Sequence, residues 1–275
     1  MPCIDLSIEA RALTLEYRWV GGAEPVPDEE LLLSPKPLIV FLHEGLGSVS
    51  MWRDFPDQVC AATGCVGLVY SRPGYGGSSV RSRGHPWGRD FMHIEARVVL
   101  PALLGALGLA SSERPLVLFG HSDGASIALI HAAHHPGSIA AVVAIAPHIM
   151  VEQVCLNSIR EAVVAFREGD LRGRLARHHQ DVEATFAGWS GAWLDPAFSD
   201  WSIESELARI DCPVLAMQGL EDRYGTLEQI RGIARRAARV RLVEIAQCGH
   251  SPHRDQPQRV LDEIVDFIDS ACISH

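Results

Sequence analysis

The sequence predicts an α/β fold: a mostly parallel, doubly wound sheet interrupted once by a helical insertion. Short, continuous apolar runs recur along the chain, as is typical of strands covered on both faces. Segments with helical periodicity alternate with these runs, which predicts right-handed connections and helices on both faces of the sheet. The apolar runs comprise residues 38–42, 66–70, 116–119, 139–145, 214–217 and 240–245.

One further strand and several helices follow from side-chain patterns. Residues 12–19 mix β-branched and aromatic side chains with polar ones, so we expect an antiparallel edge strand there. Segment 125–133 is almost wholly apolar, which predicts a buried helix. In the other segments apolar residues recur at helical spacing. These expected helices cover residues 91–107, 227–238 and 260–268.

Residues 148–205 break the alternation, because they contain no convincing strand pattern. Helical patterns occur there at residues 151–167, 171–179 and 181–189. Three tryptophans also fall in this stretch: Trp189, Trp193 and Trp201. We therefore predict that residues 148–205 form a helical cap, and that residues 1–147 and 206–275 form the α/β core.

Composition excludes several classes of protein. The 275-residue chain carries a formal net charge of −10 without a basic run, so nucleic acid is not an expected partner. The 7 cysteines form no Cys-x-x-Cys pair, so neither a zinc knuckle nor a redox motif is indicated. The N-terminus does not resemble a signal peptide, and no stretch reaches the roughly 18 apolar residues of a membrane span. We expect a cytoplasmic protein with free thiols and no membrane partner.

The candidate nucleophile is Ser122, in the sequence Gly120-His121-Ser122-Asp123-Gly124. This G-x-S-x-G motif follows an apolar strand pattern and precedes an apolar helix pattern. Such a context suits a sharp strand-to-helix turn that exposes the serine, and small neighbours let strand and helix approach. The motif alone is short, and a serine capping a helix after a glycine turn is the simpler interpretation.

A serine hydroxyl needs a general base, and the base needs a group to orient it. His250 follows the run 240–245, at the strand end where sites in open α/β sheets form, with His253 as the alternative base. Asp222 follows the run 214–217 and is the candidate acid, with Glu221 as its rival. Asp222 and His250 could also be ordinary solvated residues of turns. The chain order of serine, acid and histidine favours the catalytic interpretation instead.

Acyl transfer also needs two backbone N–H groups directed at the developing oxyanion. One would come from Asp123, the residue after the nucleophile. The other would come from the loop after the run 38–42, with Gly45 as the first candidate and Leu46 as the next. A plain glycine turn is the simpler interpretation of that loop.

These ordered motifs resemble the α/β-hydrolase superfamily over about residues 36–147 and 206–270. The resemblance rests on the loop at His43, the stretch 71–78, the Ser122 turn, and the Asp222 and His250 loops. It implies a Ser–His–Asp triad, an acyl-enzyme intermediate, no metal, no cofactor, and a cap at residues 148–205.

Two positions depart from the family pattern. Many relatives have glycine where this chain has Glu44, and Gly-Gly where it has Gly124-Ala125. The turn also carries Asp123, a negative charge near a site that must stabilise an oxyanion. We expect the Asp123 side chain to point away from the pocket into a structural contact.

The sequence therefore predicts hydrolysis of a small, fairly apolar ester, and both a monomer and a homo-oligomer are compatible with it. C–C bond hydrolysis, lactone opening and thioester hydrolysis use the same triad, and acyl transfer to an alcohol also remains open. Cofactor-free oxidoreductase chemistry and a non-catalytic ligand receptor are further alternatives. The residues expected to contact the acyl substrate are His43, Glu44, Leu46, His148 and Trp189, and Trp193 and Phe186 are additional candidates for lining the pocket.

Overall fold

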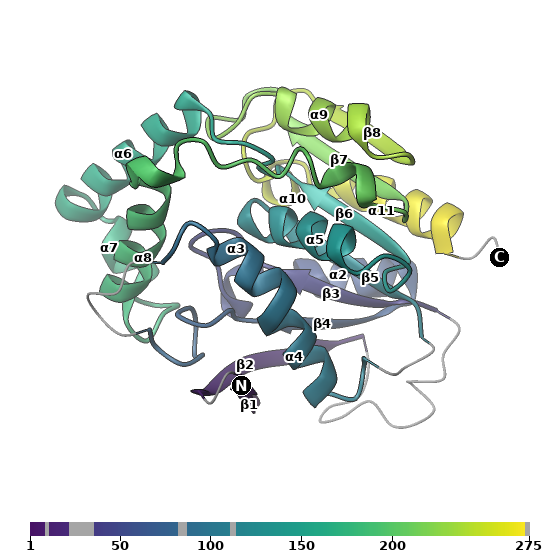
Figure 1. Cartoon of the computed structure of the whole chain (residues 1–275), viewed down its shortest axis with the longest axis horizontal. Helices are drawn as coiled ribbons and strands as arrows, with labels where there is room; N and C mark the ends of the chain where they lie inside the picture. The colour runs from purple at the N-terminus through teal and green to yellow at the C-terminus, as the bar shows by residue number, and fades with distance from the viewer. Residues whose placement is uncertain (9–10, 22–35, 82–86, 111–113, 273–275) are drawn as a thin grey trace.

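The computed structural model describes residues 1–8, 11–21, 36–81, 87–110 and 114–272 (Figure 1). Within these ranges, eight strands form one sheet in the order β1-β2-β4-β3-β5-β6-β7-β8. The strands are β1 (Cys3–Ile8), β2 (Arg11–Val20), β3 (Leu38–Leu42), β4 (Val66–Tyr70), β5 (Leu116–His121), β6 (Ala141–Ile145), β7 (Val214–Gly219) and β8 (Val240–Ile245).

The sheet is parallel from β4 through β8 in spatial order, which confirms the predicted doubly wound α/β fold. The chain passes from β3 to β4 on one side and then returns to place β5 on the other side of β3. A reversal of this kind opens a crevice at the carboxyl ends of the two central strands. Leu42 and His121 end these strands, so the crevice lies beside residues 43–47 and Ser122.

The N-terminal strand prediction was wrong about the edge of the sheet. Strand β2 covers the expected residues, but it pairs antiparallel with both β1 and β4, so it is the second strand. The edge is β1, for which the sequence analysis predicted no strand. Its apolar residues Ile4, Leu6 and Ile8 alternate with polar ones, which is the pattern of a strand with one solvated face.

Helices cover both faces of the sheet. One buried cluster joins the sheet to α3, α4, α5 and α9, and a second joins its other face to α2 and α11. In Figure 1, helices α6, α7 and α8 lie together at one end of the sheet. The bounds are α2 (Phe55–Thr63), α3 (Phe91–Ile94), α4 (Leu100–Ala106), α5 (Asp123–His134), α6 (Gln153–Glu168), α7 (Leu171–Leu175), α8 (Val182–Leu194), α9 (Glu228–Arg236), α10 (Pro252–Asp255) and α11 (Pro257–Cys272).

Two expected helices differ from the prediction: one is divided and the other is shorter. A π-helical turn at Glu95–Val99 separates α3 from α4, where one continuous helix was expected. Pro101 has no N–H to donate and its ring crowds the preceding turn, so a regular α-helical ladder cannot continue through it. Helix α7 ends at Leu175, because His179 is held by two other loops: it accepts from the Gly76 N–H at 3.0 Å and donates to the Leu46 carbonyl at 2.9 Å.

The segment expected to form the cap contains α6, α7 and α8 together with one short 3₁₀ turn at Pro196–Phe198. Phe166 of α6 stacks on Phe186 of α8 with ring centroids 3.9 Å apart, which joins the two helices. Trp193 and Trp201 pack in a second aromatic group around Phe198. Among the helices in the described ranges, none is long and apolar enough to cross a membrane.

Candidate active site

Ser122 lies on a sharp turn between β5 and α5. Its backbone has φ of 54°, a left-handed conformation that is strained for a residue other than glycine. A Cβ on Gly124 would lie 2.0 Å from the Leu42 carbonyl oxygen, and one on Gly120 would lie 2.3 Å from the Gly124 carbonyl oxygen. The two glycines are therefore required so that α5 can start directly against β3 and β5.

Ser122, His250 and Asp222 meet at the carboxyl ends of three strands. His250 Nε2 lies 3.0 Å from Ser122 Oγ. Its Nδ1 lies 2.9 Å from each of the two carboxylate oxygens of Asp222. A carboxylate only accepts, so Nδ1 carries a proton and Nε2 is free to accept the serine hydroxyl proton.

The Asp222 carboxylate is held by further donors. The Tyr224 N–H donates to Oδ1 at 2.8 Å, and Gln218 Nε2 donates to Oδ2 at 3.1 Å. Burial acts to raise the pKa of Asp222, but the hydrogen bond and charge interaction with His250, together with the Tyr224 N–H, outweigh it and lower that pKa. Asp222 therefore stays ionised at neutral pH and keeps His250 oriented.

The Glu44 carbonyl oxygen anchors the loop after β3. It accepts from His43 Nδ1 at 2.7 Å, from Arg72 Nη2 at 2.9 Å and from the Gly47 N–H at 3.0 Å. In a trans peptide the following N–H points the opposite way. The Gly45 N–H is therefore directed away from His43 and Arg72.

His43 lies behind this loop instead of lining the cavity. It is fully buried, and its Nε2 accepts from the Arg72 backbone N–H at 3.0 Å while its Nδ1 donates to the Glu44 carbonyl. Burial, with the charge of Arg72, lowers the pKa of His43 well below its usual value. A neutral ring with its proton on Nδ1 satisfies both contacts.

The Glu44 side chain links three loops of the site. Its carboxylate lies 3.7 Å from His121 Nδ1 and 3.5 Å from Arg254 Nη2. Burial acts to raise the pKa of Glu44, but interaction with His121 and Arg254 lowers it well below its usual value. His121 Nε2 in turn donates to the His250 backbone carbonyl at 2.7 Å, so Glu44 is connected to the loop that carries the base.

The Asp123 side chain is buried beside the nucleophile and makes contacts within the protein. Oδ1 accepts from Trp193 Nε1 at 3.3 Å, and Oδ2 lies 3.9 Å from Arg72 Nη2. Burial raises the pKa of Asp123, although the charge of Arg72 opposes this shift. The side chain thus ties the turn to α8 and to the stretch after β4, while the residue still borders the cavity.

A cavity of about 220 Å³ opens over Ser122. Its lining includes four of the five residues expected to contact substrate, namely Glu44, Leu46, His148 and Trp189. Phe186, a further candidate, is outside the lining. The full lining is Glu44, Gly45, Leu46, His121, Ser122, Asp123, His148, Cys155, Ile159, Trp189, Trp193, Tyr224, His250 and Ser251.

Sequence reasoning missed several of these lining residues. Cys155 and Ile159 are one helical turn apart on α6, a spacing that places them on one face. Tyr224 is in the Asp222 loop, and its ring lies 4.7 Å from the ring of His250. The helical spacing was visible in the sequence, but nothing in it indicated which face of α6 meets the cavity.

The alternative base and acid lie elsewhere. His253 is buried against Trp52 and His121, with ring centroids 5.2 Å and 4.7 Å away. Glu221 is exposed, whereas the Asp222 carboxylate reaches His250. In the described part of the chain, no group of three or more His, Cys, Asp or Glu side chains is arranged to hold a metal ion.

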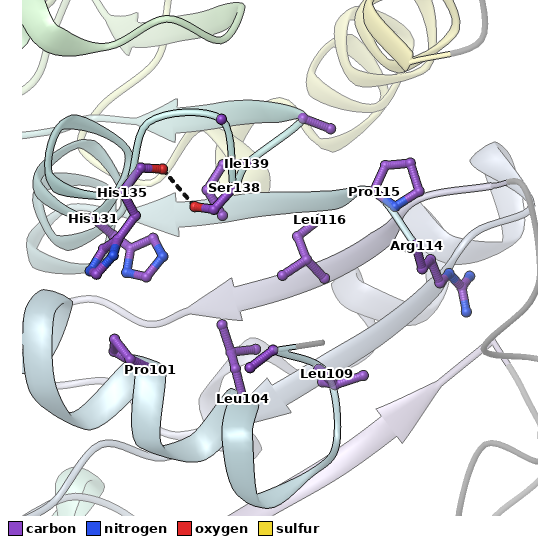
Figure 2. Close-up of a pocket in the computed structure, with 13 residues that line it drawn as sticks. Pro101, Leu104, Leu109, Arg114, Pro115, Leu116, His131, His135, Ser138 and Ile139 are labelled. Carbon is purple, nitrogen blue, oxygen red and sulfur yellow. Dashed lines mark hydrogen bonds between the residues drawn. The ribbon is translucent and has the colours of Figure 1, made fainter. Parts of the chain in front are cut away.

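A larger cavity of about 460 Å³ lies at the other end of the sheet (Figure 2). It is bordered by Leu116 at the start of β5, by Leu104, and by His131 and His135. Leu116 is six residues before Ser122 in an extended strand, a separation of about 20 Å. This cavity is therefore remote from the triad, and size alone does not identify the reactive site.

Comparisons with known proteins agree with this fold. The sequence profile described as the alpha/beta hydrolase family matches residues 39–263. Among curated proteins, no sequence is similar enough to match.

Three similar solved structures are enzymes with different substrates. An esterase from Thermogutta terrifontis is 20% identical, with a TM-score of 0.71 over 99% of this chain and 100% of that one. An enol-lactonase from Burkholderia xenovorans is 19% identical, with a TM-score of 0.70 over 96% and 99%. A meta-cleavage product hydrolase from Pseudomonas fluorescens is 16% identical, with a TM-score of 0.70 over 98% of both chains. Because the family profile spans most of the sequence, this chain belongs to the alpha/beta hydrolase family.

Proposed function

We propose that this protein is a serine hydrolase that cleaves a small carboxylic ester through an acyl-enzyme intermediate. The observation that carries the proposal is the continuous contact from Ser122 Oγ to His250 Nε2 at 3.0 Å and from His250 Nδ1 to Asp222 at 2.9 Å. Ser122 and His250 line the cavity, so a nucleophile and its base are within reach of a bound carbonyl, and Asp222 contacts the base.

In the proposed reaction, Ser122 Oγ attacks the ester carbonyl carbon while His250 Nε2 takes the hydroxyl proton. Asp222 stabilises the imidazolium that forms. The N–H groups of Gly45 and Asp123 donate to the oxyanion, which collapses as the C–O bond breaks and His250 returns the proton to the departing alcohol. Water, activated by His250, then attacks the acyl-enzyme and releases the acid.

The size and lining of the cavity favour a small substrate. Its volume of about 220 Å³ is below the 300–1,000 Å³ typical of pockets for drug-sized ligands. Trp189, Trp193 and Ile159 supply an apolar wall, which suits a short hydrocarbon group.

An ester is favoured over a C–C bond on chemical grounds. The triad and two N–H donors complete ester hydrolysis, because the alcohol leaves with a proton from His250. Cleavage of a C–C bond would also require a proton on the departing carbon. Lactones and thioesters need no such step, so they remain alternatives on the same triad. The esterase and the enol-lactonase share this fold with the chain.

Active-site labelling and an ester panel test this proposal. We expect a fluorophosphonate probe to label the folded protein at Ser122, and short-chain p-nitrophenyl esters to be hydrolysed. Ser122→Ala abolishes both, whereas Ser138→Ala, at the remote cavity, leaves both unchanged. Absence of labelling in folded protein would contradict the proposal and favour a ligand receptor.

A further inference from the structure

His148 is a polar side chain in the apolar part of the cavity. It follows β6 and is 2% exposed. Its ring lies 4.9 Å from the ring of Trp193 and 5.8 Å from the ring of His250, measured between centroids. Its Nδ1 atom is buried and has no hydrogen-bond partner among the residues that the structure describes.

The backbone of His148 is clamped, so the ring is presented in one place. Ser126 Oγ accepts from the His148 N–H at 3.0 Å and donates to the His148 carbonyl at 2.6 Å. Two residues earlier, Ala146 has φ of 46°, a strained conformation that turns the chain out of β6. The strained backbone at Ala146 and the double side-chain clamp at His148 together hold the His148 side chain in place.

The ring of His148 is neutral at physiological pH. Burial, together with the positive charge that His250 can carry, lowers the pKa of His148 to about 3. A neutral imidazole offers one N–H donor and one nitrogen acceptor. Buried polar atoms are normally paired, and a buried atom left unpaired beside a ligand cavity is suited to pair with the ligand.

We propose that His148 carries its proton on Nδ1 and donates it to a second, uncharged oxygen of the substrate, so that this enzyme selects esters bearing a keto, hydroxyl or ether oxygen close to the scissile carbonyl. This inference rests on the proposed ester hydrolysis. His148 lies next to His250, which itself contacts Ser122, so the second oxygen is within a few bonds of the reacting carbon.

The charges around the cavity favour an uncharged partner. Glu44 lines the cavity and Asp222 contacts His250 beside it, and both carboxyl groups have lowered pKa values and stay ionised. A substrate carboxylate next to His148 would meet these like charges without a cation from His148 itself. An ester whose second oxygen belongs to a carboxylate is therefore expected to be a poor substrate.

A set of matched esters tests the subsite by kinetics. Ethyl butanoate has no second oxygen, ethyl 3-oxobutanoate has one in the acyl group, 2-methoxyethyl butanoate has one in the alcohol, and monoethyl succinate has a carboxylate. For each ester we take the ratio of its kcat/KM to that of ethyl butanoate. We expect this ratio, for one of the two uncharged oxygenated esters, to be about tenfold lower in His148→Leu than in the wild type. His148→Asn, which keeps a polar atom near the Nδ1 position, retains part of the preference.

Equal ratios in the wild type, His148→Leu and His148→Asn would overturn the inference, as would a preference for monoethyl succinate that depends on His148. Circular dichroism of each variant shows that it is folded.

Binding separates failure of the subsite from failure of the proposed reaction. In the Ser122→Ala protein, calorimetry gives the Kd of each uncharged ester without turnover. We expect an oxygenated ester to bind more tightly than ethyl butanoate, and this difference to vanish in the Ser122→Ala/His148→Leu protein. If wild type hydrolyses no ester but the binding difference is present, the subsite stands and the proposed function fails. If esters are hydrolysed and there is no binding difference, the subsite fails alone.

Discussion

The Glu44 carbonyl accepts three hydrogen bonds, from His43, Arg72 and Gly47. Arg72 therefore contacts the site through the Glu44 carbonyl, which belongs to the same peptide group as the Gly45 N–H. The same guanidinium lies 3.9 Å from Asp123 Oδ2. Arg72 thus acts as a positioning residue for the two backbone N–H groups that we propose as oxyanion donors.

Asp123→Asn tests whether the side chain of Asp123 takes part in the reaction. The proposed donor is the Asp123 backbone N–H, which the substitution leaves in place. An asparagine side chain still offers an oxygen to Trp193 Nε1, now 3.3 Å from Oδ1. We expect kcat to change by less than about threefold, measured with the best p-nitrophenyl ester. A large loss of kcat in a protein with unchanged thermal stability would show that the carboxylate participates.

The turn between β5 and α5 depends on the absence of side chains at two positions. Gly124 faces the Leu42 carbonyl, and no Cβ can be accommodated without moving β3 or α5. Strands β3 and β5 and the start of helix α5 are buried, so none of these three elements can move without disturbing the core. The sharp turn at Ser122 and the close packing of the central strands therefore depend on the same two glycines.

Gly124→Ala should destabilise the fold as well as the site. A Cβ placed 2.0 Å from a carbonyl oxygen forces a backbone shift, and we expect a loss of about 3 kcal/mol or more in the free energy of unfolding. Gly191→Ala in α8 is the matched control, because a Cβ there meets nothing within 4 Å. It should stabilise the protein by about 0.5–1 kcal/mol. Urea denaturation measures both changes, and equal effects would contradict the steric argument.

Hydrogen bonds away from the candidate site also connect the helices of the core. The Glu206 carboxylate lies 2.9 Å from His93 Nε2 on α3 and 2.8 Å from His134 Nε2 at the end of α5. Glu206 follows the segment expected to form the cap, at the point where the chain re-enters the core. Its two contacts join this point to α3 and α5, which cover the same face of the sheet. Burial acts to raise the pKa of Glu206, but hydrogen bonds from the two histidines outweigh it and lower that pKa.

The contribution of Glu206 to stability should depend on pH. A carboxyl group whose pKa is lowered by folding stabilises the protein above its unfolded-state pKa of about 4.3, and loses this effect as pH falls through the lower folded-state pKa. Glu206→Gln should therefore lower Tm at pH 6–7 and have progressively less effect below about pH 4. Glu161→Gln, which removes an exposed pair with Arg223, serves as the control with little effect. A Tm difference for Glu206→Gln that is constant from pH 3 to 7 would contradict this account.

Local patterns in the sequence were sufficient to predict most of the sheet. Strands β3, β4 and β8 have the expected bounds, because continuous apolar runs between turn residues indicate buried strands. The position of β2 was wrong, since strand order depends on pairing between distant segments. The break between α3 and α4 was also missed: a proline near the start of a helical turn is compatible with several local structures, and packing selects one.

The chemical identities in the candidate site were readable from the sequence because Ser122, Asp222 and His250 each follow an apolar run and occur in the order that the chemistry requires. Their 3.0 Å and 2.9 Å contacts, the anchoring of the Glu44 carbonyl and the burial of His148 depend on side chains brought together from segments far apart in the chain. A motif specifies which groups are available. Three-dimensional packing decides which of them meet, which lose water, and hence which protons they hold, because distance and burial govern both hydrogen bonding and pKa.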